Sequence, residues 1–179
     1  ASGQPTPRVR VGLVAFRDVG DAYVTQVYPL SEDLDAVYQQ LRSFRADGGG
    51  DTPEAVQVAL SDAVEKMAWS QGPKVAKMVF LVGDAPAHPQ DRAALNAAAK
   101  RAIQKGIVVN TIRCGGDGAT EVQFREVARL ADGRFDTIEQ NGGVVAVAPP
   151  FDGELSRLNG ELMDTAIYAG RREVQALGE

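Results

Sequence analysis

The stretch "KMVFLVGDAPAH" (Lys77 to His88) places an unbroken apolar run directly ahead of a glycine and an aspartate. Such a run, without polar alternation, is typical of a strand that is buried on both faces of a parallel sheet. Asp84 follows this strand, so we expect its carboxylate at an edge of the sheet. In open α/β sheets, ligands bind outside the carboxyl ends of the strands. The stretch therefore predicts a fold class and the edge that carries the binding site.

Strands and helices alternate after this stretch. An alanine-rich helix is expected from Pro89 to Gly106, followed by a strand over "IVVNTIRC" (Ile107 to Cys114). A helix from Thr120 to about Asp132 and a short strand "RFDTIEQ" (Arg134 to Gln140) come next. This order predicts parallel strands with helices on both faces, which is a doubly wound α/β sheet.

The residues before Lys77 predict a hairpin and two more helices. "RVRVGLVAF" (Arg8 to Phe16) and "AYVTQVYPL" (Ala22 to Leu30) both alternate, with Gly20 in the turn between them. Ser31 is expected to cap the following helix. Pro53 suits the first turn of the next helix, where Asp51 and Glu54 have the spacing of a capping box.

No composition shift or linker divides the chain of 179 residues, so we expect a single domain over residues 1–170 and a polar tail over residues 171–179. The last helix is expected from about Phe151 to Ala169. The net charge of −5 disfavours a nucleic-acid partner, and no apolar run is long enough to cross a bilayer. With one cysteine, Cys114, an intrachain disulfide is impossible, and a structural thiol at a strand end is the favoured interpretation.

Three loops that carry acidic residues should meet at the carboxyl edge of the sheet. "FRDVGD" supplies Asp18 and Asp21, "VGDAPAH" supplies Asp84 and His88, and "RCGGDG" supplies Asp117. We expect the four residues other than Asp84 to form a partner-binding rim: Asp18, Asp21, His88 and Asp117.

Oxygen ligands at this edge would suit a hard cation. Mg²⁺ is usually held by one or two carboxylates and retains several waters. Asp84 with Asp51 or Thr52, from the loop "GGGDT" before the Pro53 helix, would supply part of such a shell. From spacing alone, a turn cap at Asp84 and a helix cap at Asp51 remain the stronger interpretation.

Two other kinds of site are weaker alternatives. Glycine-rich backbone ahead of a helix can bind a phosphate, but this loop carries Asp51 and lacks the Lys-Ser/Thr of a P-loop. His88, the chain's only histidine, could act as a general base beside Asp84, as in an α/β hydrolase or phosphatase. A lone histidine in a loop is more often a cap or a surface residue.

Five blocks, in order, resemble a von Willebrand factor type A (vWA) domain, most closely the bacterial stand-alone members and those fused to alpha-kinase-like regions. The blocks are "VRVGLVAFRD", "YPLSEDLDAVYQQL", "GGGDTPEAVQVAL", "MVFLVGDAPAH" and "GIVVNTIRCGG". The resemblance implies a doubly wound, Rossmann-like sheet with one antiparallel edge strand, here "AYVTQVYPL". It also implies a metal-ion-dependent adhesion site (MIDAS) that binds a partner's carboxylate without catalysing a reaction.

Carried over from the family, Asp84 matches the aspartate after the fourth strand. The family's metal-binding threonine matches Thr52 if the helix phase is aligned and Asp51 if the glycines are counted. The family's D-x-S-x-S loop and the central strand before it have no counterpart in this sequence. We therefore expect a domain that lacks its first central strand through N-terminal truncation, and weak or absent Mg²⁺ binding by this chain.

The favoured function is a non-catalytic adhesion-type module, which in its intact form binds an acidic residue of a protein partner through a divalent ion. The alternatives are an A-domain that binds partners without metal and, more weakly, a hydrolase or phosphatase using Asp84 and His88. Strand edges left unpaired by the missing strand predict self-association. Related bacterial proteins are often exported, so the expected location leans toward extracytoplasmic.

Overall fold

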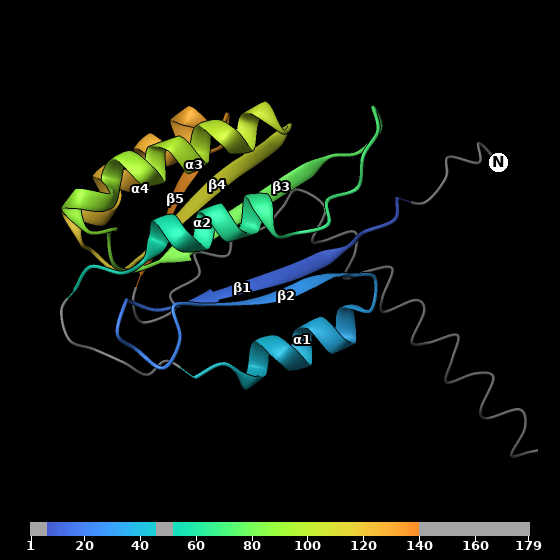
Figure 1. Ribbon diagram of the computed structural model, residues 1–179, viewed down its shortest axis with the longest axis horizontal. Coiled ribbons are helices and arrows are strands. Elements are labelled where there is room, and N and C mark those ends of the chain that lie inside the picture. The colour runs from blue at the N-terminus through green and yellow to red at the C-terminus, as the bar shows by residue number, and fades with distance from the viewer. Residues whose placement is uncertain (1–6, 46–51, 140–179) are drawn as a thin grey trace, which may run out of the picture. The chain divides into compact units, whose positions relative to one another are not determined.

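The computed structural model describes residues 7–45 and 52–139, all within a compact unit that spans residues 1–143. The helix expected from Phe151 to Ala169 and the polar tail lie outside the described residues, as does Asp51. The described part holds two groups of strands and four α-helices, which Figure 1 labels.

The N-terminal strands form the expected antiparallel hairpin. β1 (Val11–Phe16) pairs with β2 (Thr25–Ser31), with Val14 opposite Val27. A short turn connects the two strands, and the backbone N–H of Arg17 donates to the carbonyl of Val24 (3.0 Å). The sequence prediction of one antiparallel strand is therefore confirmed.

The first helix, α1 (Leu34–Ser43), begins two residues later than expected. Its N-cap is Asp33, whose Oδ1 accepts the N–H of Ala36 at 3.0 Å. The Ser31 hydroxyl instead accepts the N–H of Asp33 at 3.0 Å, so the predicted cap at Ser31 was wrong. Both side chains are good acceptors, and the one closer to the helix takes the helical N–H.

The three remaining strands form the parallel sheet that the alternating pattern predicted. β3 (Lys77–Gly83), β4 (Ile107–Cys114) and β5 (Phe135–Ile138) lie in the order β3–β4–β5. Leu81 lies opposite Thr111, and Thr111 lies opposite Phe135. The parallel sheet with its intervening helices confirms the predicted Rossmann-like α/β fold class.

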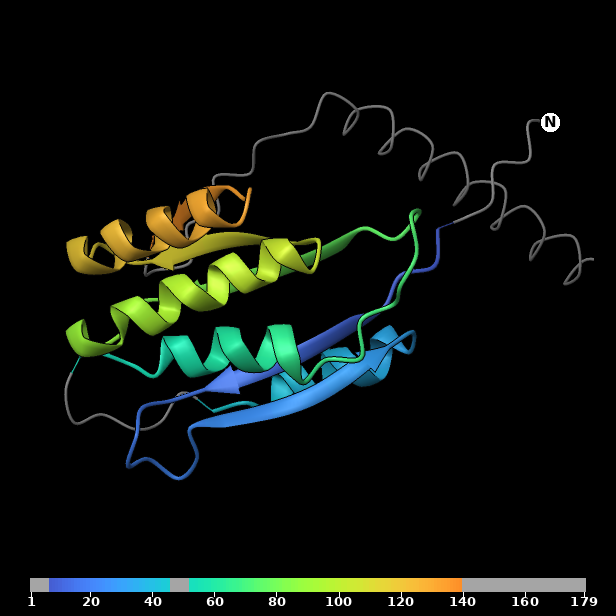
Figure 2. The ribbon, with the colours of Figure 1, turned by 45° about the horizontal axis from the view of Figure 1, so that its top comes forward.

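In the described residues, α2 (Val56–Glu65), α3 (Arg92–Gln104) and α4 (Gly118–Leu130) cover one face of this sheet, whereas the sequence predicted helices on both faces. The three helices lie side by side in Figures 1 and 2, and η1 (Pro89–Asp91) is a 3₁₀ turn ahead of α3. Their apolar sides meet the inward side chains of the strands. The largest of the fully buried side chains in this core are Phe124, Leu60, Leu95, Ile107, Val56, Val64, Val109 and Val127.

The opposite face of β3 is apolar and exposed. Met78, Phe80 and Val82 alternate along the strand with inward-facing residues, and their exposed fractions are 53%, 61% and 44%. Within residues 7–45 and 52–139, no strand joins β1 to β3, so each has an edge without a backbone partner. This agrees with the sequence, in which the family's first central strand has no counterpart.

No helix in the described ranges has the length and apolar character needed to cross a membrane.

In the turn between α4 and β5, the backbone of Gly133 lies in close contact with the backbone of β4. Asp132 adopts a left-handed conformation (φ 53°), and the N–H of Gly133 donates to the carbonyl of Ala128 at 2.9 Å. A Cβ atom on Gly133 would lie 1.8 Å from the carbonyl oxygen of Val109, in the middle of β4. Only a residue without a side chain fits here, because a buried strand cannot move aside.

Replacement of this glycine should therefore destabilise the fold. We expect Gly133→Ala to lower the free energy of unfolding by about 3 kcal/mol or more, as the added methyl group displaces the backbone of β4. Urea denaturation followed by circular dichroism measures the change. Gly116→Ala is the matched control, since a Cβ there meets nothing within 4 Å. An equal effect of the two substitutions would contradict this account.

Candidate functional site

The candidate site lies at the carboxyl edge of the strands, as the sequence predicted. β1, β3 and β4 end at Phe16, Gly83 and Cys114, and the acid-bearing loops follow directly. Asp84 is exposed immediately after β3, and its backbone carbonyl accepts a hydrogen bond from the hydroxyl of Thr120 (3.3 Å). Its carboxylate is thus available to solvent on a backbone held by a neighbouring helix.

The loop that carries Thr52 lies beside the loop that carries Asp84. The N–H of Glu54 donates to the carbonyl of Pro86 at 2.8 Å, and Glu54 forms an isolated parallel bridge with Ala87. Thr52, which is exposed, precedes this bridge by two residues. Thr52 and Asp84 therefore lie at the same edge of the sheet rather than at opposite ends.

This bridge also corrects the predicted start of the second helix. α2 begins at Val56 with Ala55 as its N-cap, and no side chain accepts a hydrogen bond there. Pro53 and Glu54 lie before the helix, and the N–H of Glu54 bonds to Pro86 instead of taking part in a capping box. The capping-box spacing was coincidental: the segment extends to pair with the Asp84 loop.

A buried glutamine fixes the Asp84 loop from the other side. Gln123 of α4 accepts the N–H of Ala87 (2.9 Å) and donates to the carbonyl of Ala87 (3.0 Å). Ala87 has no exposed surface, and Gln123 retains 8%. Both polar groups of Ala87 are thereby satisfied away from water, which makes the loop between Asp84 and His88 a rigid platform.

The structure brings two predicted rim residues together. Nε2 of His88 lies 2.9 Å and 3.0 Å from the two carboxylate oxygens of Asp18, and each side chain is 19% exposed. Asp21 supports this pair, because its carboxylate accepts the N–H of Asp18 at 3.3 Å. The pair links the loop after β1 to the loop after β3, although these strands share no backbone pairing.

Burial alone would raise the pKa of Asp18, but hydrogen bonds from His88 and the Val19 backbone, with the charge of His88, hold that pKa below its usual value. The carboxylate of Asp18 is therefore ionised over the physiological range.

Asp117, the fourth predicted rim residue, lies at the same edge but serves as a helix cap. Its Oδ2 accepts both the N–H and the hydroxyl of Thr120 at 2.6 Å, at the start of α4. The Thr120 hydroxyl, aided by nearby backbone N–H groups and Arg113, lowers the pKa of Asp117. Because this carboxylate is the N-cap of α4, it is less available to bind a partner.

Cys114 closes β4 beside Asp84. Burial raises the pKa of its thiol, and the negative charge of Asp84 raises it further. A thiol held in the protonated form is a poor nucleophile and metal ligand. This agrees with the structural role that the sequence favoured.

The described residues supply only part of a metal site. No group of three or more His, Cys, Asp and Glu side chains in residues 7–45 and 52–139 is arranged to hold a metal ion. Asp84 and Thr52 offer two oxygens at one edge, and Asp51 is not described. The assignment of Asp84, Thr52 and Asp51 as metal ligands therefore stays a prediction, as does the role of the rim residues in binding a partner.

Two positioning residues escaped sequence reasoning: Glu54 and Gln123. Glu54 was interpreted as part of a helix cap. Gln123 follows Thr120 by three residues and precedes Val127 by four, on the apolar side of a predicted helix. A polar pair on the buried stripe of a helix was the available indication, because such groups require a hydrogen-bond partner.

Comparisons with known proteins agree with this geometry. The family model for the von Willebrand factor type A domain matches residues 4–141. The chain belongs to the vWA family. This is a family of protein-interaction modules.

Solved structures support the fold of this vWA domain. The SpRpn10 VWA domain aligns with a TM-score of 0.53 at 16% identity, over 73% of this chain and 65% of that chain. Proximal thread matrix protein 1 from the mussel byssus, in a form with a zinc-occupied MIDAS motif, aligns with a TM-score of 0.54 at 16% identity, over 72% of this chain and 30% of that chain.

One curated relative matches a shorter stretch of the vWA domain. It is the putative ariadne-like RING finger protein R811 of Acanthamoeba polyphaga mimivirus, 30% identical over 88 residues. The match covers 49% of this chain and 8% of that protein, so this chain spans only a small part of the relative's length.

Loss of the Gln123 amide should loosen the Asp84 loop. We expect Gln123→Ala to lower the free energy of unfolding by about 2–4 kcal/mol, because it leaves two buried backbone groups of Ala87 without partners. It should also accelerate hydrogen exchange at the N–H of Ala87, measured by NMR. Gln104→Ala, on an exposed turn of α3, is the control and should change stability by less than about 0.5 kcal/mol. Unchanged protection of Ala87 in Gln123→Ala would refute this role.

The Asp18–His88 pair should weaken in acid. The folded-state pKa of Asp18 is lowered, so its contribution to stability is present above the unfolded pKa near 3.8 and is lost as the pH falls through the folded value. The stability difference between wild type and Asp18→Asn should therefore shrink as the pH falls from about 5 to about 2. Chemical denaturation at a series of pH values tests this, with the exposed Asp136→Asn as control. A difference that stayed constant with pH would count against the pairing.

Proposed function

We propose that this vWA domain is a non-catalytic binding module, whose edge around Asp84 takes an acidic group of a partner protein through a divalent ion. The observation that carries the proposal is the bridge between Glu54 and Ala87, with its 2.8 Å hydrogen bond from Glu54 to Pro86. It places the loops of Thr52 and Asp84 side by side at the edge where α/β sheets bind ligands.

The available side chains suit a hard cation. Asp84 contributes an exposed carboxylate on a backbone fixed through Thr120, and Thr52 contributes a hydroxyl. Both are oxygen ligands of the kind that Mg²⁺ takes, with water completing its shell. Asp51 is the neighbouring alternative to Thr52, and further ligands would come from residues outside the described part. When bound, the ion would supply the positive charge that attracts a partner's carboxylate.

Surrounding charges favour a cation at this edge over an anion. Asp84, Asp18 and Asp117 all lie on the loops after β1, β3 and β4, and the pKa values of Asp18 and Asp117 are lowered, so these two are ionised at neutral pH. A bare acidic group of a partner would be repelled by this edge. A bound divalent ion would reverse the local charge, so the acidic group of the partner would bind to the metal-loaded domain and not to the metal-free one.

A hydrolase remains a distinguishable alternative, because a histidine paired with an aspartate also occurs in general-base catalysis. The geometry gives Asp18 and His88 another role, which is to join the loops after β1 and β3. Cys114 is held as a thiol and is no candidate nucleophile. Turnover of p-nitrophenyl phosphate that disappears in His88→Ala would favour the hydrolase; we expect no turnover by wild type.

A second binding mode, without metal, is favoured by one observation. The described residues hold no group of three His, Cys, Asp or Glu side chains that could bind a metal ion. In this mode the rim would contact a partner directly through its rigid loops. The two modes differ in their response to a chelator, which leaves only direct binding intact.

Metal titration tests the proposal on the intact protein. We expect calorimetry with MgCl₂, MnCl₂ and ZnCl₂ to show one weak site. Asp84→Ala removes a carboxylate ligand and should weaken this site at least about tenfold, which corresponds to about 1.4 kcal/mol of binding free energy. Asp136→Ala, on exposed β5, is the matched control and should bind as wild type does.

Equal metal affinity in wild type and Asp84→Ala would contradict the assignment of Asp84. Absence of any metal binding by the intact wild type would leave the metal-independent mode as the function of the rim.

A further inference from the structure

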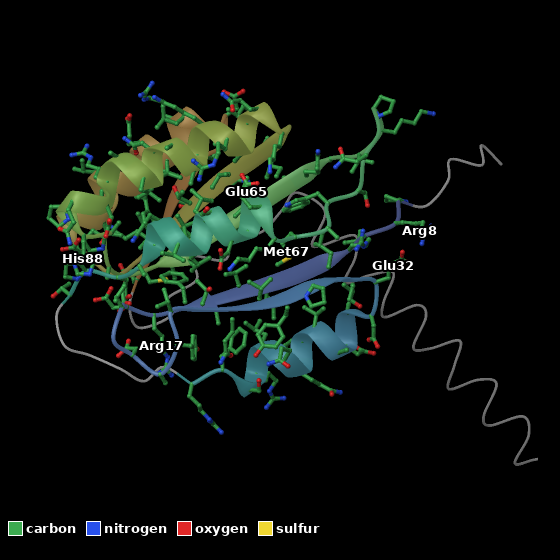
Figure 3. All side chains as sticks on the ribbon, in the orientation of Figure 1. Arg8, Arg17, Glu32, Glu65, Met67 and His88 are labelled. Carbon is green, nitrogen blue, oxygen red and sulfur yellow. The ribbon has the colours of Figure 1, made fainter. Side chains whose placement is uncertain are left out.

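A hollow lies at the amino ends of β3 and β4, away from Asp84. It has a volume of about 400 Å³ and is bounded by the end of α2, the loop after it, the end of α3 and the first residues of β3 and β4. We call it the basal hollow. Figure 3 shows Glu65 and Met67, two of its lining residues, well apart from His88 at the other end of the strands.

The floor of the basal hollow is apolar. Val64 and Ile107 are fully buried core residues, Met67 is 9% exposed, and Trp69 packs against the core. The indole N–H of Trp69 donates to the carbonyl of Ala63 at 2.9 Å, which fixes the ring as one wall. A preformed hollow of this size, with an apolar floor and polar groups at its mouth, has the character of a ligand site.

The mouth of the hollow carries an excess of positive charge. Lys105 and Arg101 both pair with Glu65, the Arg101–Glu65 distance being 3.4 Å, and the hydrogen bond from Lys105 lowers the pKa of Glu65. Lys77 lines the hollow as well, and its Nζ donates to the carbonyl of Lys105 at 2.6 Å. Two lysines of the lining, Lys77 and Lys105, therefore accompany a single carboxylate, that of Glu65, in a chain whose net charge is −5.

Lys77 is the cation that has hydrogen-bond donors left for a ligand. In residues 7–45 and 52–139, no carboxylate forms an ion pair with it. An ammonium group has three donors, and the carbonyl of Lys105 takes one. Because Lys77 lines the hollow, a carboxylate bound there would gain charge-assisted hydrogen bonds from the remaining donors.

We propose that the basal hollow binds a peptide segment of a partner protein in which an apolar side chain stands next to a carboxylate. The apolar side chain would rest against Trp69 and Met67, and the carboxylate would pair with Lys77. Charge complementarity selects an acidic segment over a basic one. The vWA domain would then have two binding surfaces at opposite ends of its strands, one around Asp84 and one around Trp69.

Trp69 makes this proposal directly measurable, because it is the only tryptophan in the chain. The probe is the peptide acetyl-Ala-Leu-Glu-Ala-amide, titrated to 10 mM while the emission of Trp69 is followed. The emission should shift and saturate for this peptide. Its glutamine counterpart, acetyl-Ala-Leu-Gln-Ala-amide, should bind at least about tenfold more weakly, as expected for loss of a charge-assisted hydrogen bond.

Substitution of Lys77 locates the binding. Lys77→Met should weaken the glutamate peptide at least about tenfold, and Lys77→Glu should abolish its effect on the emission. Lys74→Glu is the matched control, since Lys74 is exposed three residues before Lys77 but does not line the hollow, and it should bind as wild type does. Circular dichroism and the melting temperature confirm that each variant is folded.

Three results would overturn the proposal: no change in the emission of wild type up to 10 mM peptide, equal affinity for the two peptides, or equal losses in Lys74→Glu and Lys77→Glu. Half-saturation by sodium acetate at the same concentration as by the peptide would show that a free carboxylate suffices and would overturn the peptide assignment. Binding at this hollow should be indifferent to EDTA and to Asp84→Ala, so its outcome is independent of the metal titration at the rim.

Discussion

The short parallel bridge between Glu54 and Ala87 organises the candidate site, because it brings together two loops that lie more than thirty residues apart in the chain. A single hydrogen bond of this kind contributes only about 0.5–1.5 kcal/mol, so it could not hold the loops alone. It holds because Gln123 satisfies both polar groups of Ala87 from the opposite side. The loop that carries Asp84 is thus held from two sides, by Glu54 and by Gln123, while the side chain of Asp84 remains exposed.

The strands and most helices were predictable, because the spacing of apolar residues along each element reflects which of its faces is buried. The unbroken apolar run before Asp84 and the alternation in β1 and β2 depend on which face of a strand meets the core. The position of Asp84 at the sheet edge follows from the same reasoning. The resemblance to the vWA family depended on the order of the five sequence blocks along the chain, because no single block was specific.

The connections between elements were less predictable, because several side chains compete for the same backbone groups. Ser31 and Asp33 are both good caps, and only geometry decides that Asp33 bonds the helix. Glu54 has capping-box spacing, yet the partner it finds is Pro86, from a distant part of the chain. Asp117 was predicted only as a rim residue, and the structure shows that it also caps α4 through the N–H and the hydroxyl of Thr120. Propensity ranks such options but does not choose between them without the tertiary contacts.

His88 offers a spectroscopic probe of the carboxyl edge, in addition to its contact with Asp18. As the sole histidine of the chain, it gives one pair of imidazole C–H resonances in a proton NMR spectrum, and it joins the loop after β3 to the loop after β1. Any occupant of the carboxyl edge would change the environment of that ring without isotope labelling or an attached dye. The molecule thus carries a built-in spectroscopic label at the place where its partner would be expected to arrive.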